Sequence, residues 1–312
     1  MRRIAILPLF ALALAAPVAA QQSGAPFTIA ETGQGFATLA DAVAAIGDRR
    51  GTIVIAPGTY RQCVVQEAGQ ITFKAAQPGT AIFEAETCED KAAFVLRGKG
   101  SAVDGIVFRG YAVSDGNGAG IRIEQGDLTV TNSMFLDSQE GILGGNPSPQ
   151  RITIDRSTFS GLGQCETSDC SHSVYLGNKG QVTITRSRFE RGTGGHYVKL
   201  RVPNITITDS SFDDTQGSKT NYMIDLSEGS SGLIARNVFV QGENKENWSG
   251  FIVVAAEGRT YRSNGLTITE NQASLAPGID RSPAFVADLS GEQYRISGNQ
   301  LGPGVREFER RR

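Results

Sequence analysis

The sequence has few of the residues from which metal sites and nucleic-acid surfaces are built. It contains only 2 histidines and 4 cysteines, and 30 lysines and arginines are outnumbered by 32 aspartates and glutamates. The acidic balance excludes the basic surface that nucleic-acid binding requires. The only zinc site we consider would use Cys165, Cys170 and His172, and the scarcity of histidine argues against it. We expect no metal and no other cofactor.

Long hydrophobic runs are also missing beyond the start of the chain. No later segment has the run of about 18 apolar residues that a membrane-spanning helix needs. The first segment, MRRIAILPLFALALAAPVAA, has a basic start, a short apolar centre and a small-residue end at Ala20, which predicts a secretory signal peptide over residues 1–20. Its cleavage would change the net charge from −2 to −4 by removing two arginines. We expect a periplasmic or secreted protein without a membrane span.

A short pattern repeats through the middle and end of the chain, about once every 23 to 30 residues. It consists of an aliphatic residue, any residue, an aliphatic residue, two mostly polar residues, Ser or Asn, any residue and Phe. Its occurrences are LTVTNSMF at Leu128, ITIDRSTF at Ile152, VTITRSRF at Val182, ITITDSSF at Ile205, GLIARNVF ending at Phe239, and the weaker LTITENQA at Leu266 and YRISGNQL at Tyr294. The alternating apolar residues predict strands with one buried face. Units this short must stack to enclose a core, which favours an all-β fold, a single-stranded parallel β-helix.

Stacked coils would place equivalent residues about 4.8 Å apart in columns. The Phe position predicts an internal aromatic ladder of Phe135, Phe159, Phe189, Phe212 and Phe239. The Ser or Asn position predicts a ladder of turn residues that bond the local backbone, namely Ser133, Ser157, Ser187, Ser210, Asn237, Asn271 and Asn299. Both columns are interpreted as structural.

The ends of the solenoid require covers for their unpaired strand edges. Residues 39–46 read as an amphipathic helix with Thr38 as its N-cap, within an N-terminal cap over about residues 36–50. Residues 278–312 read as an irregular, charged C-terminal cap. No linker interrupts the repeats, so we expect residues 21–312 to form a single domain.

The four cysteines of an exported chain indicate disulfides, for which three connectivities exist. Cys63 and Cys88 lie 25 residues apart, close to the length of one coil, which would place them on adjacent coils. Cys165 and Cys170 would close a small loop.

A second strand in each coil defines the face where we expect a functional site. Its inward positions are Ile121, Ile142, Val174, Val198, Ile224 and Val253. The next residues form an outward column of Arg122, Leu143, Tyr175, Lys199, Asp225 and Val254. A second outward column contains Glu124, Gly145, Gly177, Arg201, Ser227 and Ala256. Before these strands lie His172, His196 and Tyr222 at equivalent positions, and after them Glu228 and Glu257.

The helix over residues 39–46, the strand GTIVIAPGTY and the Ile-x-Ile-x-x-Ser/Asn-x-Phe coils resemble the right-handed parallel β-helix superfamily that includes pectate lyases. This resemblance, with the preference of parallel crossovers, implies right-handed coils. The segments GGHYVKLR and NYMIDLSEG resemble poorly characterised exported bacterial β-helix proteins. The chain lacks the paired-aspartate and Gly-His-Gly motifs of polygalacturonases and the Asp-Pro-His-Asp motif of mannuronan epimerases. No catalytic role is therefore transferred by resemblance, since the superfamily hosts lyases, hydrolases, epimerases and proteins without known activity.

The charged face predicts a protein that binds an acidic polysaccharide or cell-envelope glycan and cleaves or epimerises it by abstraction of the C5 proton. Arg201 suits the grip on a uronate carboxylate. Lys199 is either a base or a second clamp, and in the latter case Tyr175, His196 or His172 transfers protons. The expected substrate-binding residues are Arg122, Tyr222, Asp225, Glu228 and Glu257. We expect a monomer.

Three alternatives remain open at this stage. A non-catalytic polysaccharide-binding or envelope scaffold needs no proton transfer. A glycoside hydrolase would use Asp225 with Glu228, or Glu257 with Glu228, at about 5 to 9.5 Å. Lys199 and Asp225 could also form an ordinary surface ion pair, with the histidines as corner residues.

Overall fold

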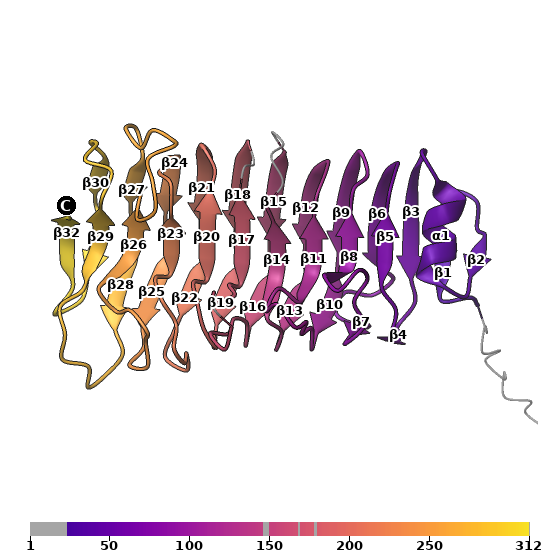
Figure 1. The fold of residues 1–312 in the computed structure, drawn as a ribbon, viewed down its shortest axis with the longest axis horizontal. Coiled ribbons are helices and arrows are strands. Elements are labelled where there is room, and N and C mark those ends of the chain that lie inside the picture. Colours follow the sequence, from indigo (N-terminus) through magenta and orange to yellow (C-terminus); the bar gives the residue numbers. More distant parts are fainter. Residues whose placement is uncertain (1–23, 146–149, 168, 178–179, 312) are drawn as a thin grey trace, which may run out of the picture.

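The chain winds into a right-handed parallel β-helix whose coils follow one another in a single row from the N-terminal to the C-terminal side (Figure 1). The computed structural model describes residues 24–145, 150–167, 169–177 and 180–311. The predicted signal peptide, residues 1–20, lies outside the described residues. Each regular coil adds one strand to each of three long sheets, which we call sheets A, B and C.

The three sheets run along the whole solenoid, and their neighbouring strands are parallel except where β1 pairs with β2 and β3. Sheet A contains, in spatial order, β2 (Gly35–Phe36), β1 (Phe27–Ile29), β3 (Arg50–Ile55), β6 (Gln70–Ala75), β9 (Gly100–Asp104), β12 (Asp127–Thr131), β15 (Arg151–Asp155), β18 (Gln181–Thr185), β21 (Asn204–Thr208), β24 (Ser231–Ala235), β27 (Thr267–Thr269) and β30 (Arg295–Ser297). Sheet B contains β4 (Gly58–Tyr60), β7 (Ala81–Glu84), β10 (Ile106–Arg109), β13 (Met134–Leu136), β16 (Thr158–Ser160), β19 (Arg188–Glu190), β22 (Ser211–Asp213), β25 (Val238–Gln241), β28 (Gln272–Leu275) and β31 (Gln300–Leu301). Sheet C contains β5 (Val64–Gln66), β8 (Ala92–Leu96), β11 (Ala119–Ile123), β14 (Glu140–Gly144), β17 (Val174–Gly177), β20 (Val198–Arg201), β23 (Ile224–Leu226), β26 (Gly250–Val254), β29 (Ala284–Asp288) and β32 (Arg306–Arg310).

The two predicted ladders are confirmed and together fix the stacking of the coils. The rings of Phe159, Phe189 and Phe212 are buried and stack at centroid distances of 4.8 Å. In the polar ladder, the backbone N–H of Ser187 donates to Ser210 Oγ at 3.0 Å, and the same bond recurs from coil to coil. These side chains satisfy backbone donors at the turns, where the sheets cannot.

The N-terminal cover is the predicted helix α1 (Leu39–Ile46). Thr38 Oγ1 accepts a hydrogen bond from the backbone N–H of Asp41 at 3.1 Å, as expected of an N-cap. The helix buries Leu39, Ala42, Val43 and Ile46 against the first coils.

The expectation of an irregular C-terminal segment is wrong. Strands β29 to β32 extend all three sheets to Arg310. The charged residues of Arg306–Arg310 are compatible with a strand at the end of a sheet. One edge of this strand faces solvent, so its side chains can be charged while its backbone pairs with β29 on the other edge.

Both predicted disulfides are present, Cys63–Cys88 and Cys165–Cys170. The second uses both sulfur atoms of the considered zinc site, which rules that site out. Across the described ranges, no helix has the length and apolarity to cross a bilayer.

Candidate functional site

A cavity of about 540 Å³ lies on the outer face of sheet C and is surrounded by polar side chains. We call it the sheet C cavity. Strands β17 and β20 supply Tyr175, Lys199 and Arg201; His172 and His196 come from just before these strands, and Glu140 is the first residue of β14. The remaining wall comes from turns and loops that include Asp115, Asn117, Asp169, Asn221, Glu246 and Glu257.

The predicted register brings the expected residues together. Tyr175 is the parallel partner of Lys199, and Lys199 is the partner of Asp225, while Gly177 pairs with Arg201. Six of the ten predicted catalytic and substrate-binding residues line the cavity: Tyr175, Lys199, Arg201, His172, His196 and Glu257. Asp225 and Glu228 contact these residues, at 3.4 Å from Lys199 Nζ and 3.5 Å from Arg201 Nε respectively.

Two predicted substrate-binding residues lie beside the cavity instead of lining it. Arg122 is on the same face, two coils before Tyr175, with its Nε 3.9 Å from Glu124 Oε1. Tyr222 stacks on His196 at a centroid distance of 5.5 Å, and its hydroxyl accepts a hydrogen bond from Asn247.

The predicted register fails one coil later. Ile252, not Val253, pairs with Ile224, so Val253 points outward and packs against Ala284 and Ala287. The strand β26 is buried on both faces and reads GFIVV. Without a polar residue to mark the outer face, the alternation that defines a register is lost.

One carboxylate connects the two cations of the cavity. Glu257 accepts hydrogen bonds from Lys199 Nζ on one oxygen and from Arg201 Nη2 on the other. The Tyr175 ring lies beside both cations, 5.8 Å from Lys199 Nζ and 5.1 Å from Arg201 Cζ. Lys199 points away from the core, as predicted, but it is only 7% exposed, because the side chains around the cavity cover it.

The carboxyl groups around Lys199 differ in their proton affinity. Partial burial raises the pKa of Glu257, but hydrogen bonds from Arg201 and Lys199 outweigh this effect and lower the pKa to about 2. Burial raises the pKa of Asp225 above its ordinary value, against the opposing charge of Lys199 and a hydrogen bond from Ser227 Oγ at 2.7 Å.

The two histidines form a buried pair, and one backbone hydrogen bond fixes the tautomer of His172. His172 Nδ1 accepts the backbone N–H of His196 at 3.0 Å, so its proton is on Nε2. His196 Nδ1 lies 3.3 Å from the same His172 Nδ1. His196 Nε2 lies 3.6 Å from Asp225 Oδ2. Burial lowers the pKa of both rings well below 6.5, which keeps them neutral.

These histidines predict acid-sensitive stability. The unfolded chain protonates both rings below pH 6.5, whereas the folded chain keeps them neutral beside Lys199. The stability provided by the neutral rings is thus complete above pH 6.5 and is lost as the pH falls. In urea unfolding between pH 6.5 and 5, we expect each histidine to contribute a slope of up to about 1.4 kcal/mol per pH unit. The double variant His172→Gln/His196→Gln should show a shallower slope than the native chain, and an unchanged slope would contradict the buried neutral pair.

Glu140 is the functional candidate that the sequence reading missed. It lines the cavity, is 1% exposed and stands two residues before Ile142, as His172 stands two residues before Val174. Extending the His172, His196 and Tyr222 column by one coil would have found it. Asn221 and Glu246 follow Thr220 and Lys245, whose bridges to Gly195 and to Thr220 align them with His196, whereas Asp115 lies in a turn outside the repeat.

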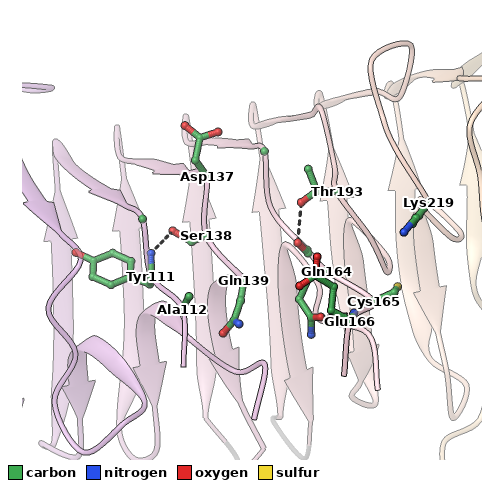
Figure 2. Close-up of a pocket in the computed structure, with 13 residues that line it drawn as sticks. Tyr111, Ala112, Asp137, Ser138, Gln139, Gln164, Cys165, Glu166, Thr193 and Lys219 are labelled. Carbon is green, nitrogen blue, oxygen red and sulfur yellow. Dashed lines mark hydrogen bonds between the residues drawn. The ribbon is translucent and has the colours of Figure 1, made fainter. Parts of the chain in front are cut away.

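A second cavity of about 500 Å³ lies over the turns that follow sheet B (Figure 2). The polar groups at its floor are bonded internally: Ser138 Oγ accepts the backbone N–H of Tyr111 at 3.0 Å, and Thr193 donates to the Gly163 carbonyl at 2.6 Å. Of the described residues that line it, none is a histidine, and its carboxylates, Asp137 and Glu166, are exposed. We therefore place the candidate site in the sheet C cavity.

Comparisons with known proteins agree with the architecture. The family model described as "Right handed beta helix region" matches residues 92–301. The search of curated proteins gave no match. Among solved structures, an alginate lyase from Paenibacillus sp. str. FPU-7 is similar, with 17% identity and a TM-score of 0.61 over 83% of this chain and 90% of that chain. At this identity the likeness concerns the fold.

More distant structures are also similar to this chain. A DFA-IIIase from Arthrobacter chlorophenolicus A6 has 14% identity and a TM-score of 0.45, over 82% of each chain. The surface adhesin PfbA of Streptococcus pneumoniae has 11% identity and a TM-score of 0.45, over 86% of this chain and 87% of that chain.

Proposed function

We propose that this chain, which belongs to the right-handed β-helix family, is an exported carbohydrate-active protein that binds a uronic-acid polysaccharide in the sheet C cavity and abstracts its C5 proton. The observation that carries the proposal is the Glu257 carboxylate between Lys199 and Arg201, beside the Tyr175 ring. A sugar carboxylate that takes the place of Glu257 would find the same donors. The two disulfides and the predicted signal peptide suit an oxidising location outside the cytoplasm.

The cations supply the binding and activation step. Arg201 can bind a carboxylate through two parallel hydrogen bonds, and Lys199 adds a second positive charge. Neutralising the carboxylate makes the adjacent C5–H bond more acidic. Because Lys199 already pairs with Asp225 and Glu257, we assign it to the clamp and not to the base.

We assign the base to His196, which lines the cavity and is held neutral because burial lowers its pKa. The C5–H bond breaks and the proton moves to His196 Nε2. The electron pair left at C5 forms a C4=C5 double bond as the C4–O4 bond breaks, which is elimination. Reprotonation of C5 from the opposite face gives epimerisation from the same first step.

A screen with two simultaneous readouts tests this function. The mature protein is incubated with alginate, pectate, hyaluronan and bacterial capsular polymers, and both ultraviolet absorbance and reducing ends are recorded. Elimination raises both signals, and epimerisation changes the uronate composition of a retained polymer. Reducing ends without absorbance would identify a hydrolase, retention without product would identify a scaffold, and neither retention nor product would contradict carbohydrate binding.

The Arg201→Ala variant should bind the polymer about 10- to 100-fold more weakly, since a hydrogen bond to a charged group contributes about 1.5 to 3 kcal/mol. Its thermal transition should change little because Glu257 keeps its ion pair with Lys199 when Arg201 is removed. Arg236→Ala is the matched control, since Arg236 pairs with Asp209 on the solvated turn after sheet A. Affinity measured by calorimetry decides the outcome: equal losses in both variants would argue against the clamp.

A further inference from the structure

We propose that Glu140 is the acid of this site, a buried carboxylic acid that gives its proton to the oxygen leaving C4 of the sugar. The inference rests on the proposed function and names the group that completes its reaction. The elimination proposed above has a base, and it has two cations that bind the sugar carboxylate. It still lacks a donor for the proton that the leaving oxygen needs.

The Glu140 side chain is buried at the wall of the cavity and has an oxygen atom that can still accept a hydrogen bond from a ligand or donate one to it. It is the first residue of β14, is 1% exposed and lines the same cavity as Tyr175 and Lys199. Its Oε2 atom is buried and has no hydrogen-bond partner among the described residues. A buried polar atom without a partner costs about 1 to 3 kcal/mol, so a ligand that supplies the partner recovers this energy.

The surroundings of Glu140 favour the protonated form. Burial raises its pKa well above the ordinary value, and the charge of Asp115 acts in the same direction. The charge of Arg122 and a hydrogen bond from the backbone of His172 oppose the shift but do not cancel it. Glu257, with a pKa of about 2, is ionised in the same cavity. The cavity therefore holds one neutral and one ionised carboxyl group, and only the neutral one can donate a proton.

Glu140 also has a suitable position relative to the base. Glu140, His172 and His196 occupy equivalent positions on three consecutive coils, so the backbones of Glu140 and His196 are about 10 Å apart along the solenoid. Both side chains line the cavity between them. A sugar held by Arg201 and Lys199 can therefore meet the base on one side and the acid on the other.

The resulting step balances in atoms and charge. His196 Nε2 accepts the C5 proton, the C4–O4 bond breaks, and O4 takes the proton of Glu140. The products are an unsaturated sugar, a free hydroxyl, an imidazolium and a carboxylate. Arg122 stabilises the new carboxylate, and water returns the proton from His196 to Glu140 after the products leave.

The first experiment compares Glu140→Gln with the native protein on two substrates. Glutamine has the same size, and a neutral acid has no ion pair to lose, so the thermal transition should change little. On the polymer we expect a loss of about 100- to 10,000-fold in kcat, the usual contribution of a general acid. On a uronide with fluoride at C4, whose departure needs no proton at oxygen, the loss should be within about tenfold. Glu190→Gln, on sheet B, is the control and should match the native rates.

The pH profile and infrared spectrum separate this inference from the proposed function. The native kcat should fall at alkaline pH as Glu140 ionises, and Glu140→Gln should lack that limb. At neutral pH, the native spectrum should contain a protonated-carboxyl band that Glu140→Gln lacks. A missing band, or native activity in Glu140→Gln, would overturn the role of Glu140 while leaving the function standing. The band without turnover of any polymer would instead overturn the proposed function and the proton transfer, and leave Glu140 as a neutral acid.

Discussion

Replacing Phe189 with alanine should lower the free energy of unfolding by about 3 to 5 kcal/mol, as large-to-small changes in a well-packed core do. The Phe189 ring is fully buried, and it stacks on Phe159 and Phe212 with interplanar angles of 7° and 3°. Its neighbours belong to coils that are held apart by continuous parallel sheets. The vacated space therefore cannot collapse easily, and the cavity term stays large.

Urea unfolding followed by circular dichroism measures this loss. Val238→Ala is the control, because Val238 is on the same sheet B but is 43% exposed, and its truncation should change stability by about 0.5 kcal/mol or less. A loss at Phe189 no larger than that at Val238 would contradict the aromatic ladder as a main source of stability.

The fold was predictable from sequence because its signals repeat. The alternating apolar residues, the Phe column and the Ser or Asn column each recur at the same place in successive coils, so every coil confirms the register of its neighbour. That redundancy placed Tyr175, Lys199 and Asp225 side by side. In Gly250–Val254 no polar residue alternates with the apolar ones, and there the predicted register was wrong by one residue.

The candidate site was predictable only where it follows the repeat. Tyr175, Lys199 and His196 occupy columns, and columns can be aligned by eye. Glu257 was predicted as a substrate-binding residue, but the turn that brings it to Lys199, 58 residues earlier in the chain, follows no periodicity. Whether Lys199 is exposed or covered depends on such turns, so its low exposure could not be predicted.

A buried ion pair supports one wall of the sheet C cavity. The side chains of Lys245 and Asp214 are both fully buried, with Lys245 Nζ 2.9 Å from Asp214 Oδ2. Asp214 also accepts hydrogen bonds from the hydroxyls of Tyr197 and Thr220, each at 2.8 Å. The backbone of Thr220 pairs with Gly195 on one side and with Lys245 on the other. The residues that follow Thr220 and Lys245 are Asn221 and Glu246, and both line the cavity. The pair therefore joins loops of three coils.

The Asp214→Ala variant should lose about 3 to 5 kcal/mol of stability, because it leaves a buried ammonium without a counter-charge. Burial already lowers the pKa of Lys245 despite the opposing charge of Asp214, so removal of Asp214 should lower this pKa further.

A double-mutant cycle with Lys245→Met separates the pair from the packing around it. Methionine fills much of the same space without a charge, so Asp214→Ala/Lys245→Met should be more stable than Asp214→Ala alone. Urea unfolding of the native protein, the two single variants and the double variant gives the coupling energy. Titration of each protein with a uronan measures its affinity for the polymer, which depends on how the loops are placed. If Asp214→Ala loses less than about 1 kcal/mol, or the double variant loses the full sum of the single losses, the ion pair does not hold these loops. If the double variant recovers stability but binds polymer more weakly than the native protein, the charges serve to orient the loops that carry Asn221 and Glu246.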